Sequence, residues 1–429
     1  MSVLFIADEP VPPVVNGATA LYFSWIDALS EKGPLCVVLL VRPGSDTAEA
    51  DRYLGRVCRA HKIIEMPSRS LFAKLALLAG RNLTGAIFGP AWLEAHGLGK
   101  VHRELRRFIA ENGIETIIVN KIPSLHAVGI PLLKAFQGRK LINLHDDFVS
   151  QAQIDREVHR RLVGSYPELS SYRPYRIARL RNRLHRFRAS AARTQELAML
   201  GLFDTVLINS SEEFAFYAPR LPSGGRALRW PHVLPAGIPL KEMAEAPPFD
   251  IGYIAANAAI NLEGLLFFHR EILPRLRRNR PHLRMLVTGA VTEPFSRFVR
   301  PGDGVVMERN VPDSGAFFRR IKISVVPLLS GTGVSLKTIE ALLHGVPTVA
   351  TSMGVRGLNV EDGKDLLIAD RPEEFAQAIE SLLGDPQRAA ALGQQGAATI
   401  ADQADRSRFV AAIREALDGE VSQGAPLEC

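Results

Sequence analysis

The chain has 429 residues, of which 47% are hydrophobic, 23% charged and 7% aromatic, and its formal net charge is +7. This composition excludes a disordered or fibrous protein. Because the length exceeds what one hydrophobic core usually supports, we expect two domains. The three cysteines, Cys36, Cys58 and Cys429, form no C-x-x-C pair, so neither a disulfide scaffold nor a structural zinc site is expected, and a reducing compartment fits best.

The first residues predict a buried strand rather than a signal peptide. Residues 3–6 are apolar, but the run is short and no basic region precedes it. No segment reaches the roughly 18 to 20 apolar residues that span a bilayer. The longest apolar region, residues 71–98, is interrupted by charged residues and a proline. We therefore expect a cytoplasmic protein whose contact with a membrane, if any, is peripheral and at the inner face.

Short apolar runs alternate with helical patterns through the first half of the chain. Several runs are apolar without alternation, which is typical of parallel strands buried on both faces. The repeated order of strand and helix predicts βαβ units and a doubly wound α/β domain over residues 1–240. The expected strands are 3–7, 35–41, 62–65, 116–120, 141–144 and 205–209, and helices are expected at 18–32 and 100–112.

The net positive charge of the chain is concentrated in an arginine-rich segment, residues 156–193. Its eleven arginines against two glutamates give it a net charge of +9, more than the whole chain. Four of them follow a helical spacing beside an apolar stripe: Arg176, Arg179, Arg183 and Arg186. The pattern fits a surface helix docked on its own domain, and it equally fits contact with anionic lipid or another polyanion. Nucleic acid is not expected, because no recognised binding motif accompanies the arginines.

A proline-rich and glycine-rich stretch, residues 231–248, reads as a linker to a second α/β series. This series predicts another Rossmann-like domain over residues 249–417, followed by a flexible tail at 418–429. The default binding site of such a protein lies beyond the carboxyl ends of the strands, in the cleft between domains. The expected strands are 250–255, 284–288, 304–307, 323–328, 348–351 and 366–369, with helices at 262–279, 335–344 and 372–383.

The most informative window follows the predicted strand that ends at Pro327. A turn, Gly331-Thr332-Gly333, leads into a helix that starts near Ser335. The unpaired N–H groups of a helix start form a seat for phosphate. Lys337 would add a positive charge there, and Glu340, one helical turn further, could accept hydrogen bonds from two sugar hydroxyls. The alternative is an ordinary strand–turn–helix unit with Lys337 and Glu340 on the surface.

Another polar group, His145-Asp146-Asp147, directly follows the predicted strand 141–144. These residues would project at the carboxyl edge of the sheet, where a histidine can move a proton and an adjacent carboxylate can fix its tautomer. The alternative is a polar loop with an Asp cap on the next helix. No G-x-S-x-G, N-terminal G-x-G-x-x-G or P-loop motif is present, which excludes α/β-hydrolases, dinucleotide dehydrogenases and P-loop proteins.

The window around residue 337 resembles the nucleotide-sugar glycosyltransferases of the GT-B fold, particularly glycosyltransferase family four. Members carry Lys-x-x-Glu-Ala on the helix after the glycine-rich turn, as in Lys337 to Ala341, and then Gly-x-Pro-x-Val-Ala-Thr, as in Gly345 to Thr351. Residues 254–274, 354–358, 362–363 and 366–369 are also similar. The resemblance covers about residues 249–417 and is weaker in the first half.

The resemblance implies transfer of a sugar from a nucleotide-diphosphate donor to a saccharide or lipid-linked acceptor, with retention, in synthesis of cell-surface polysaccharide or glycoconjugates. It implies an acceptor-side first domain, a donor-side second domain, and no metal or cofactor besides the nucleotide sugar. A nucleotide-sugar epimerase and a non-catalytic binding subunit on the same scaffold remain alternatives. The residues implied in catalysis are His145, Asp146 and Glu340, and those in donor binding are Asn16, Gly17, Asn261, Gly331, Thr332, Gly333, Val334, Ser335 and Lys337.

Two positions depart from the pattern of the family. Many members have a glutamate where this chain has Thr332, and many carry an arginine and a lysine after the first strand of the second domain to neutralise the diphosphate. Residues 252–261 contain neither cation. Lys337 is the expected substitute.

Overall fold

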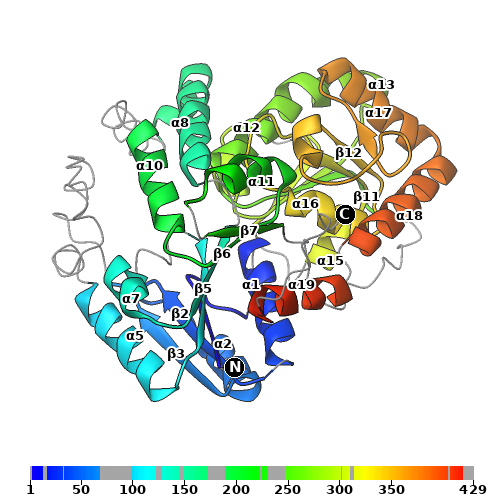
Figure 1. Ribbon diagram of the computed structural model, residues 1–429. Helices are drawn as coiled ribbons and strands as arrows, with labels where there is room; N and C mark the ends of the chain where they lie inside the picture. Colours follow the sequence, from blue (N-terminus) through cyan, green and yellow to red (C-terminus); the bar gives the residue numbers. More distant parts are fainter. Residues whose placement is uncertain are drawn as a thin grey trace. The chain divides into compact units, whose positions relative to one another are not determined.

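The structure is a computed structural model in which the chain forms two compact units (Figure 1). The first unit comprises Met1–Val149, Leu180–Pro235 and Arg406–Glu428, and the second comprises Ser150–Arg179 and Ala236–Asp405. The residues that the structure describes are 2–12, 17–31, 33–67, 98–121, 128–144, 148–171, 189–222, 225–229, 247–300, 302–309, 314–403 and 406–418. The arginine-rich stripe at 176–186, the apolar region 71–97, most of the linker and the tail lie outside them.

The first unit is built on a seven-stranded parallel sheet with the order β3-β2-β1-β4-β5-β6-β7. Its strands are β1 (Val3–Ala7), β2 (Leu35–Val41), β3 (Ala60–Glu65), β4 (Thr116–Asn120), β5 (Arg139–Leu144), β6 (Thr205–Ile208) and β7 (Arg226–Arg229). The helices that belong to it are α1 (Gly17–Ser30), α2 (Ala48–Val57), α5 (Gly99–Glu111), α7 (Ile130–Ala135), α10 (Ala189–Leu200) and α11 (Ser211–Tyr217), with a short 3₁₀ turn at Ala218–Arg220. All six predicted strands are present, and β7 is an additional edge strand.

The inner strands of this sheet are buried on both faces, which is why their sequences do not alternate. Leu4 and Ile6 of β1 belong to the hydrophobic cluster on one face, whereas Val3, Phe5 and Ala7 belong to the cluster on the other. Both sets are buried. Each face is therefore covered by helices, as parallel sheets require.

Helix α19 (Arg406–Asp418) completes the core of the first unit rather than the second. The ring of Phe409 packs edge-on against Trp25 of α1 with centroids 5.5 Å apart. Arg226 of β7 pairs with Glu415 at 3.2 Å, and the guanidinium of Arg139 donates to the carbonyl of Leu417. The compact units thus differ from the predicted boundary at residue 417, because the apolar face of α19 has its partners in the first unit.

The second unit is built on a six-stranded parallel sheet with the order β10-β9-β8-β11-β12-β13. Its strands are β8 (Phe249–Ile254), β9 (Met285–Thr288), β10 (Val305–Glu308), β11 (Ile321–Val326), β12 (Thr348–Ala350) and β13 (Leu367–Ile368). Its helices are α8 (Phe148–Ser165), α12 (Ala259–Phe267), α13 (Leu273–Asn279), α14 (Thr292–Phe295), α15 (Ser314–Phe318), α16 (Leu336–Leu343), α17 (Pro372–Gly384) and α18 (Pro386–Gln403). One π-helical turn, η3 (Phe268–Ile272), joins α12 to α13, and 3₁₀ turns occur at Pro167–Ser171 and Ser352–Val355. The predicted doubly wound α/β architecture is confirmed in both units.

Helix α8 packs on the second unit, although its residues were expected in the first domain. Val158 and Leu162 on α8 are buried in the same cluster as Leu262 and Leu266 of α12. This apolar stripe on α8 explains why the compact units differ from the predicted boundaries here as well. Among the described residues, no helix is both long and apolar enough to cross a membrane.

Each sheet contains one point where the order of its strands reverses. In the first unit the reversal lies between β1 and β4, and in the second between β8 and β11. The loops that leave two such strands diverge to opposite faces of the sheet, so a crevice opens beyond their carboxyl ends. The glycine-rich turn follows β11, so it lies at the strand reversal of the second unit.

Candidate functional site

The candidate site lies at the strand reversal of the second unit, where the loops after β8 and β11 meet helix α16. Helix α12 approaches the loop after β11 closely at Gly264, since a Cβ atom there would lie 2.5 Å from the carbonyl oxygen of Pro327. Gly333 has a φ of +66°, in the left-handed region that favours glycine, and it turns the loop into α16. The two glycines therefore allow the close packing and the sharp entry that form the site.

The amino end of α16 is open among the residues that the structure describes. Ser335 is the N-cap, and its carbonyl oxygen accepts from the N–H groups of Thr338 and Ile339 at 3.0 and 3.2 Å. The amide N–H groups of Ser335, Leu336 and Lys337 donate to no described residue. The Thr338 hydroxyl donates to the carbonyl of Gly354 (2.6 Å), which ties the helix start to the 3₁₀ turn after β12. These amides and the helix dipole are suited to bind an anion.

Lys337 lies in the first turn of α16 and points at the residues that follow β8. Its ammonium donates to Oδ1 of Asn261 at 2.5 Å and lies 5.4 Å from the ring centroid of Tyr253. The Asn261 amide nitrogen donates to the carbonyl of Ala256 at 3.0 Å, and the Tyr253 hydroxyl donates to the carbonyl of Asn261 at 2.8 Å. Asn261 is buried with both ends of its amide engaged, so it orients Lys337.

Burial changes the charge that Lys337 carries. It lowers the pKa of the ammonium to about 7, because a desolvated cation is disfavoured and no carboxylate within the described part of the chain pairs with it. About half of the Lys337 side chains are then protonated at neutral pH. An anion bound beside the ammonium would favour its protonated form.

Glu340 lies one turn beyond Lys337 on the same helix. Its half-buried side chain has no hydrogen bond or ion pair to any described residue. Burial raises its pKa to about 7, because the carboxylate is desolvated. The helix thus presents a cation-forming and an anion-forming group with similar pKa values. Binding of sugar hydroxyls by Glu340 stays a prediction.

The glycine-rich turn is fastened to helix α8 by two polar contacts. The Thr332 hydroxyl donates to Oε1 of Gln151 at 2.5 Å, and the Gln151 amide donates to Asp155 at 2.9 Å. Gln151 and Asp155 both lie on α8, where they share one face. Thr332, which occupies the position of the missing glutamate, is therefore engaged with α8 in this structure.

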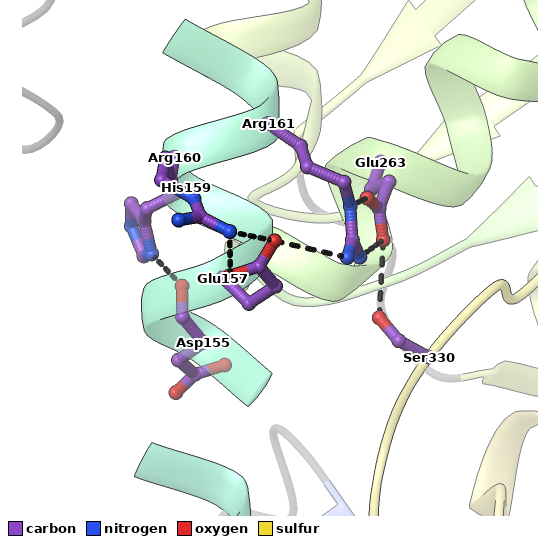
Figure 2. A network of polar contacts seen from close by, with 7 residues as sticks. All are labelled: Asp155, Glu157, His159, Arg160, Arg161, Glu263 and Ser330. Atoms are coloured by element: carbon purple, nitrogen blue, oxygen red, sulfur yellow. Dashed lines mark hydrogen bonds and ion pairs between the residues drawn. The ribbon is translucent and has the colours of Figure 1, made fainter. Parts of the chain in front are cut away.

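The second contact is the Arg161–Glu263–Ser330 network (Figure 2). The Arg161 guanidinium of α8 makes two hydrogen bonds to the buried carboxylate of Glu263 on α12, at 2.8 and 3.2 Å. The same carboxylate accepts from the Ser330 hydroxyl at 3.0 Å. Glu157 also lies near Arg161, at 3.8 Å. The network therefore connects the glycine-rich turn to both α12 and α8.

Two arginines next to the turn were not assigned to the site from the sequence. Arg161 was grouped with the arginine-rich surface, and Arg356 was noted only within the motif 354–358. Arg356 lies after β12, and its guanidinium donates to the carbonyl of Gly331 at 3.1 Å. Arg356 thus lies beside the glycine-rich turn although it is 25 positions further along the chain, whereas the charge of Arg161 is paired with Glu263.

The remaining predicted residues are only partly placed. Gly17 begins α1 in the first unit, and Val334 lies half-buried between Gly333 and the N-cap of α16. Asn16, His145, Asp146 and the arginines at 176, 179, 183 and 186 lie outside the described residues, so their roles stay predictions. Within the described ranges, no group of three or more His, Cys, Asp or Glu side chains is placed to hold a metal ion.

Two doubly wound parallel sheets, each with its own strand reversal, are found in proteins of the GT-B fold. The crystal structure of Anabaena HepE in complex with UDP and glucose has a TM-score of 0.61 to this chain, covering 98% of this chain and 100% of that one at 14% identity. The chain therefore has the GT-B glycosyltransferase fold. Residues 248–385, which lie in the second unit, match the family model of glycosyl transferases group 1.

Two curated proteins are similar to parts of the chain. One is an uncharacterised 44.6 kDa protein in the cps region of Klebsiella pneumoniae, 24% identical over 160 residues and 34% of this chain. The other is the D-inositol 3-phosphate glycosyltransferase of Paenarthrobacter aurescens, 32% identical over 114 residues and 25% of this chain. The matches span 41% and 28% of the length of these relatives, respectively.

Proposed function

We propose that the protein is a glycosyltransferase that moves a sugar from a nucleotide-diphosphate donor to a saccharide or lipid-linked acceptor. The observation that supports this most strongly is the start of α16, at the strand reversal of the second unit. There, three backbone amides that donate to no described residue lie on the same helix as Lys337 and Glu340, within the residues that match the group 1 family model. HepE, a structural neighbour over the whole chain, has been crystallised with UDP and glucose, which supports a nucleotide sugar as the ligand.

The geometry supports a division of labour along α16. The diphosphate lies on the amides of Ser335 to Lys337, and its charge holds Lys337 in the protonated form. Glu340 accepts hydrogen bonds from hydroxyls of the donor. As the bond between the anomeric carbon and the phosphate oxygen breaks, the amides and the ammonium stabilise the negative charge of the leaving diphosphate. The acceptor oxygen bonds to the anomeric carbon and passes its proton to the phosphate oxygen that leaves, and we propose retention of configuration.

Helix α8 contributes by preorganisation. The Gln151–Thr332 contact and the Arg161–Glu263–Ser330 network hold the turn against α8 and α12. Donors that are already oriented toward the developing charge need no reorganisation during the reaction. Arg161 is thus proposed to position Ser330 and the turn rather than to touch the reacting atoms.

The proposal is tested first by binding. A panel of nucleotide sugars, including UDP-glucose, is screened for a rise in melting temperature, because a ligand of the native state stabilises it. Transfer is then followed with the ligand that binds. Glu340→Ala is expected to abolish transfer without unfolding the protein, whereas Glu374→Ala, which removes an exposed carboxylate of α17, retains it. Unchanged turnover in Glu340→Ala rejects the assigned role.

The alternatives differ in their products. An epimerase converts the nucleotide sugar without an acceptor, so release of an altered nucleotide sugar in the absence of acceptor selects it. A folded protein that no nucleotide sugar stabilises is instead a non-catalytic binding subunit. Both outcomes contradict the proposed transfer.

We further propose a cytoplasmic role in synthesis of cell-surface polysaccharide or glycoconjugates, with contact to the inner membrane face through Arg176, Arg179, Arg183 and Arg186. One curated relative is described as a protein in a cps region, which supports the polysaccharide role. Vesicles with and without anionic lipid test the membrane contact. Salt-sensitive co-sedimentation with anionic vesicles alone is expected, and equal recovery with both kinds of vesicle contradicts it.

A further inference from the structure

The first unit carries a polar cluster, Asp8–Tyr22–Lys121, at its own strand reversal. Asp8 follows β1 and Lys121 follows β4, and these two strands pair directly where the order of the sheet reverses. Tyr22 reaches the cluster from α1, and its hydroxyl donates to the Asp8 carboxylate at 2.5 Å. Open α/β sheets bind ligands beyond the carboxyl ends of strands at such a reversal. The cluster therefore occupies a second ligand-binding position of the fold.

Lys121 has an unusual backbone and an unusual environment. Its φ is +62°, and it is the one non-glycine residue with a positive φ in the described part of the chain. Glycine would adopt this conformation without strain, and such strained residues concentrate at functional sites. The ammonium lies 5.4 Å from the ring centroid of Tyr22. No carboxylate of a described residue lies within ion-pair distance of this half-buried cation.

The strands beneath Lys121 are locked together by a buried amide pair. The Asn120 side chain donates to the carbonyl of Ile6 in β1 at 2.9 Å and accepts from the Asn143 side chain of β5 at 3.2 Å. Both asparagines are fully buried. Hydrogen bonds among buried polar groups are strong and directional, so the backbone just before Lys121 is held rigidly. The lysine is thus presented at a fixed place on the sheet edge.

We propose that Lys121 binds the phosphate group of a phosphorylated saccharide, the acceptor of the transfer. The inference rests on the proposed function, and it adds the chemical class of the acceptor. The ammonium supplies the charge that a phosphate requires, and the aromatic face beneath it limits its motion. The Asp8 oxygen that does not receive the Tyr22 hydroxyl remains an acceptor for a sugar hydroxyl. An uncharged saccharide would give the lysine no ion-pair partner.

The test reads each lysine separately by NMR. Reductive methylation with ¹³C-formaldehyde labels the lysines and keeps their charge, and the Lys121 and Lys337 signals are assigned with the variants Lys121→Met and Lys337→Met. Glucose 6-phosphate is the probe, and glucose is its uncharged match. Glucose 6-phosphate is expected to shift the Lys121 signal. Its dissociation constant is expected to be roughly tenfold or more below that of glucose, because a hydrogen bond between charged groups strengthens binding by about that factor.

Matched variants separate binding from folding. Lys121→Arg is expected to keep the preference for the phosphorylated sugar. Lys121→Gly, which relieves the backbone strain and so keeps the fold, is expected to lose it. Lys134→Met, which removes an exposed lysine of α7, leaves the preference unchanged.

Two results overturn the proposal. One is a shift of the Lys337 signal alone, because the phosphate then binds only the proposed donor site. The other is equal affinity for glucose and glucose 6-phosphate. Failure of the proposed function is read independently, as the absence of any Lys337 shift with a nucleotide sugar.

Discussion

Binding of a nucleotide sugar is expected to be tightest near pH 7, because two half-buried groups on α16 must carry opposite charges. Burial lowers the pKa of Lys337 to about 7 and raises that of Glu340 to about 7. The donor diphosphate favours the protonated lysine, and hydroxyls that donate to Glu340 favour the carboxylate. Binding therefore takes up a proton above pH 7, where the free lysine is neutral, and releases one below pH 7, where the free glutamate is neutral.

The magnitude follows from the fraction of molecules that carry both charges before binding. With independent titration this fraction is about one quarter at pH 7 and about one twelfth at pH 6 or pH 8. The apparent dissociation constant is then expected to rise about threefold from pH 7 to either value. At pH 5 or pH 9 the rise is about 25-fold, which corresponds to about 2 kcal/mol.

Calorimetry at several pH values, in two buffers of different ionisation enthalpy, measures the affinity and the proton exchange together. The diphosphate of a nucleotide sugar is esterified at both ends and does not titrate in this range. Lys337→Met is expected to weaken binding and to remove proton uptake above pH 7, and Glu340→Gln is expected to remove proton release below pH 7. An affinity independent of pH, with no proton exchange in the unmodified protein, refutes this reasoning.

Three further predictions concern stability. Gly264→Ala places a Cβ atom 2.5 Å from a carbonyl oxygen of the loop after β11, so the free energy of unfolding measured in urea should fall by about 1 to 3 kcal/mol. The control is Gly164→Ala on α8, where a Cβ atom meets nothing within 4 Å and the protein should not be destabilised. Burial lowers the pKa of His102, so the unfolded chain binds the proton more tightly than the folded protein does. The melting temperature should therefore fall as the pH drops below about 6.5. If a His102→Leu variant loses stability in acid to the same extent, this prediction is contradicted. Arg161→Met leaves the carboxylate of Glu263 buried without its cation and should lower the free energy of unfolding by about 1 to 2 kcal/mol; the cost is kept small by the partial exposure of Arg161 to solvent. The double variant with Glu263→Met should recover part of this loss. If the effects of the two single variants simply add in the double variant, the pair is not coupled.

The central strands of the first sheet were predictable because they are buried at every position. A run such as Leu35–Val41 in β2 is buried at every position, so it has neither the helical nor the alternating period, and only a central parallel strand fits it. The edge strand β7 was missed for the opposite reason. Its four residues are half-buried and include two arginines, so neither hydrophobicity nor period distinguishes it from a loop.

The site was only partly predictable, because its polar contacts join residues far apart in sequence. The sequence alone indicates that Lys337 and Glu340 are one turn apart on the same helix. The partner of Arg161 is Glu263, 102 positions away, and nothing local marks that pair. The partial loss of charge on Lys337 also follows from tertiary burial rather than from its neighbours in the chain.

Helix α19 gives the first unit a particular order of assembly during synthesis. Phe409, Ile413 and Leu417 belong to the same hydrophobic cluster as Phe5 and Trp25. On the ribosome, the amino-terminal sheet emerges early but leaves this apolar surface uncovered while more than 150 further residues are translated. The second unit, which lies between, has all its strands available first. The domain that is translated first is therefore the last to close its core, and the nascent chain must be protected from aggregation until then.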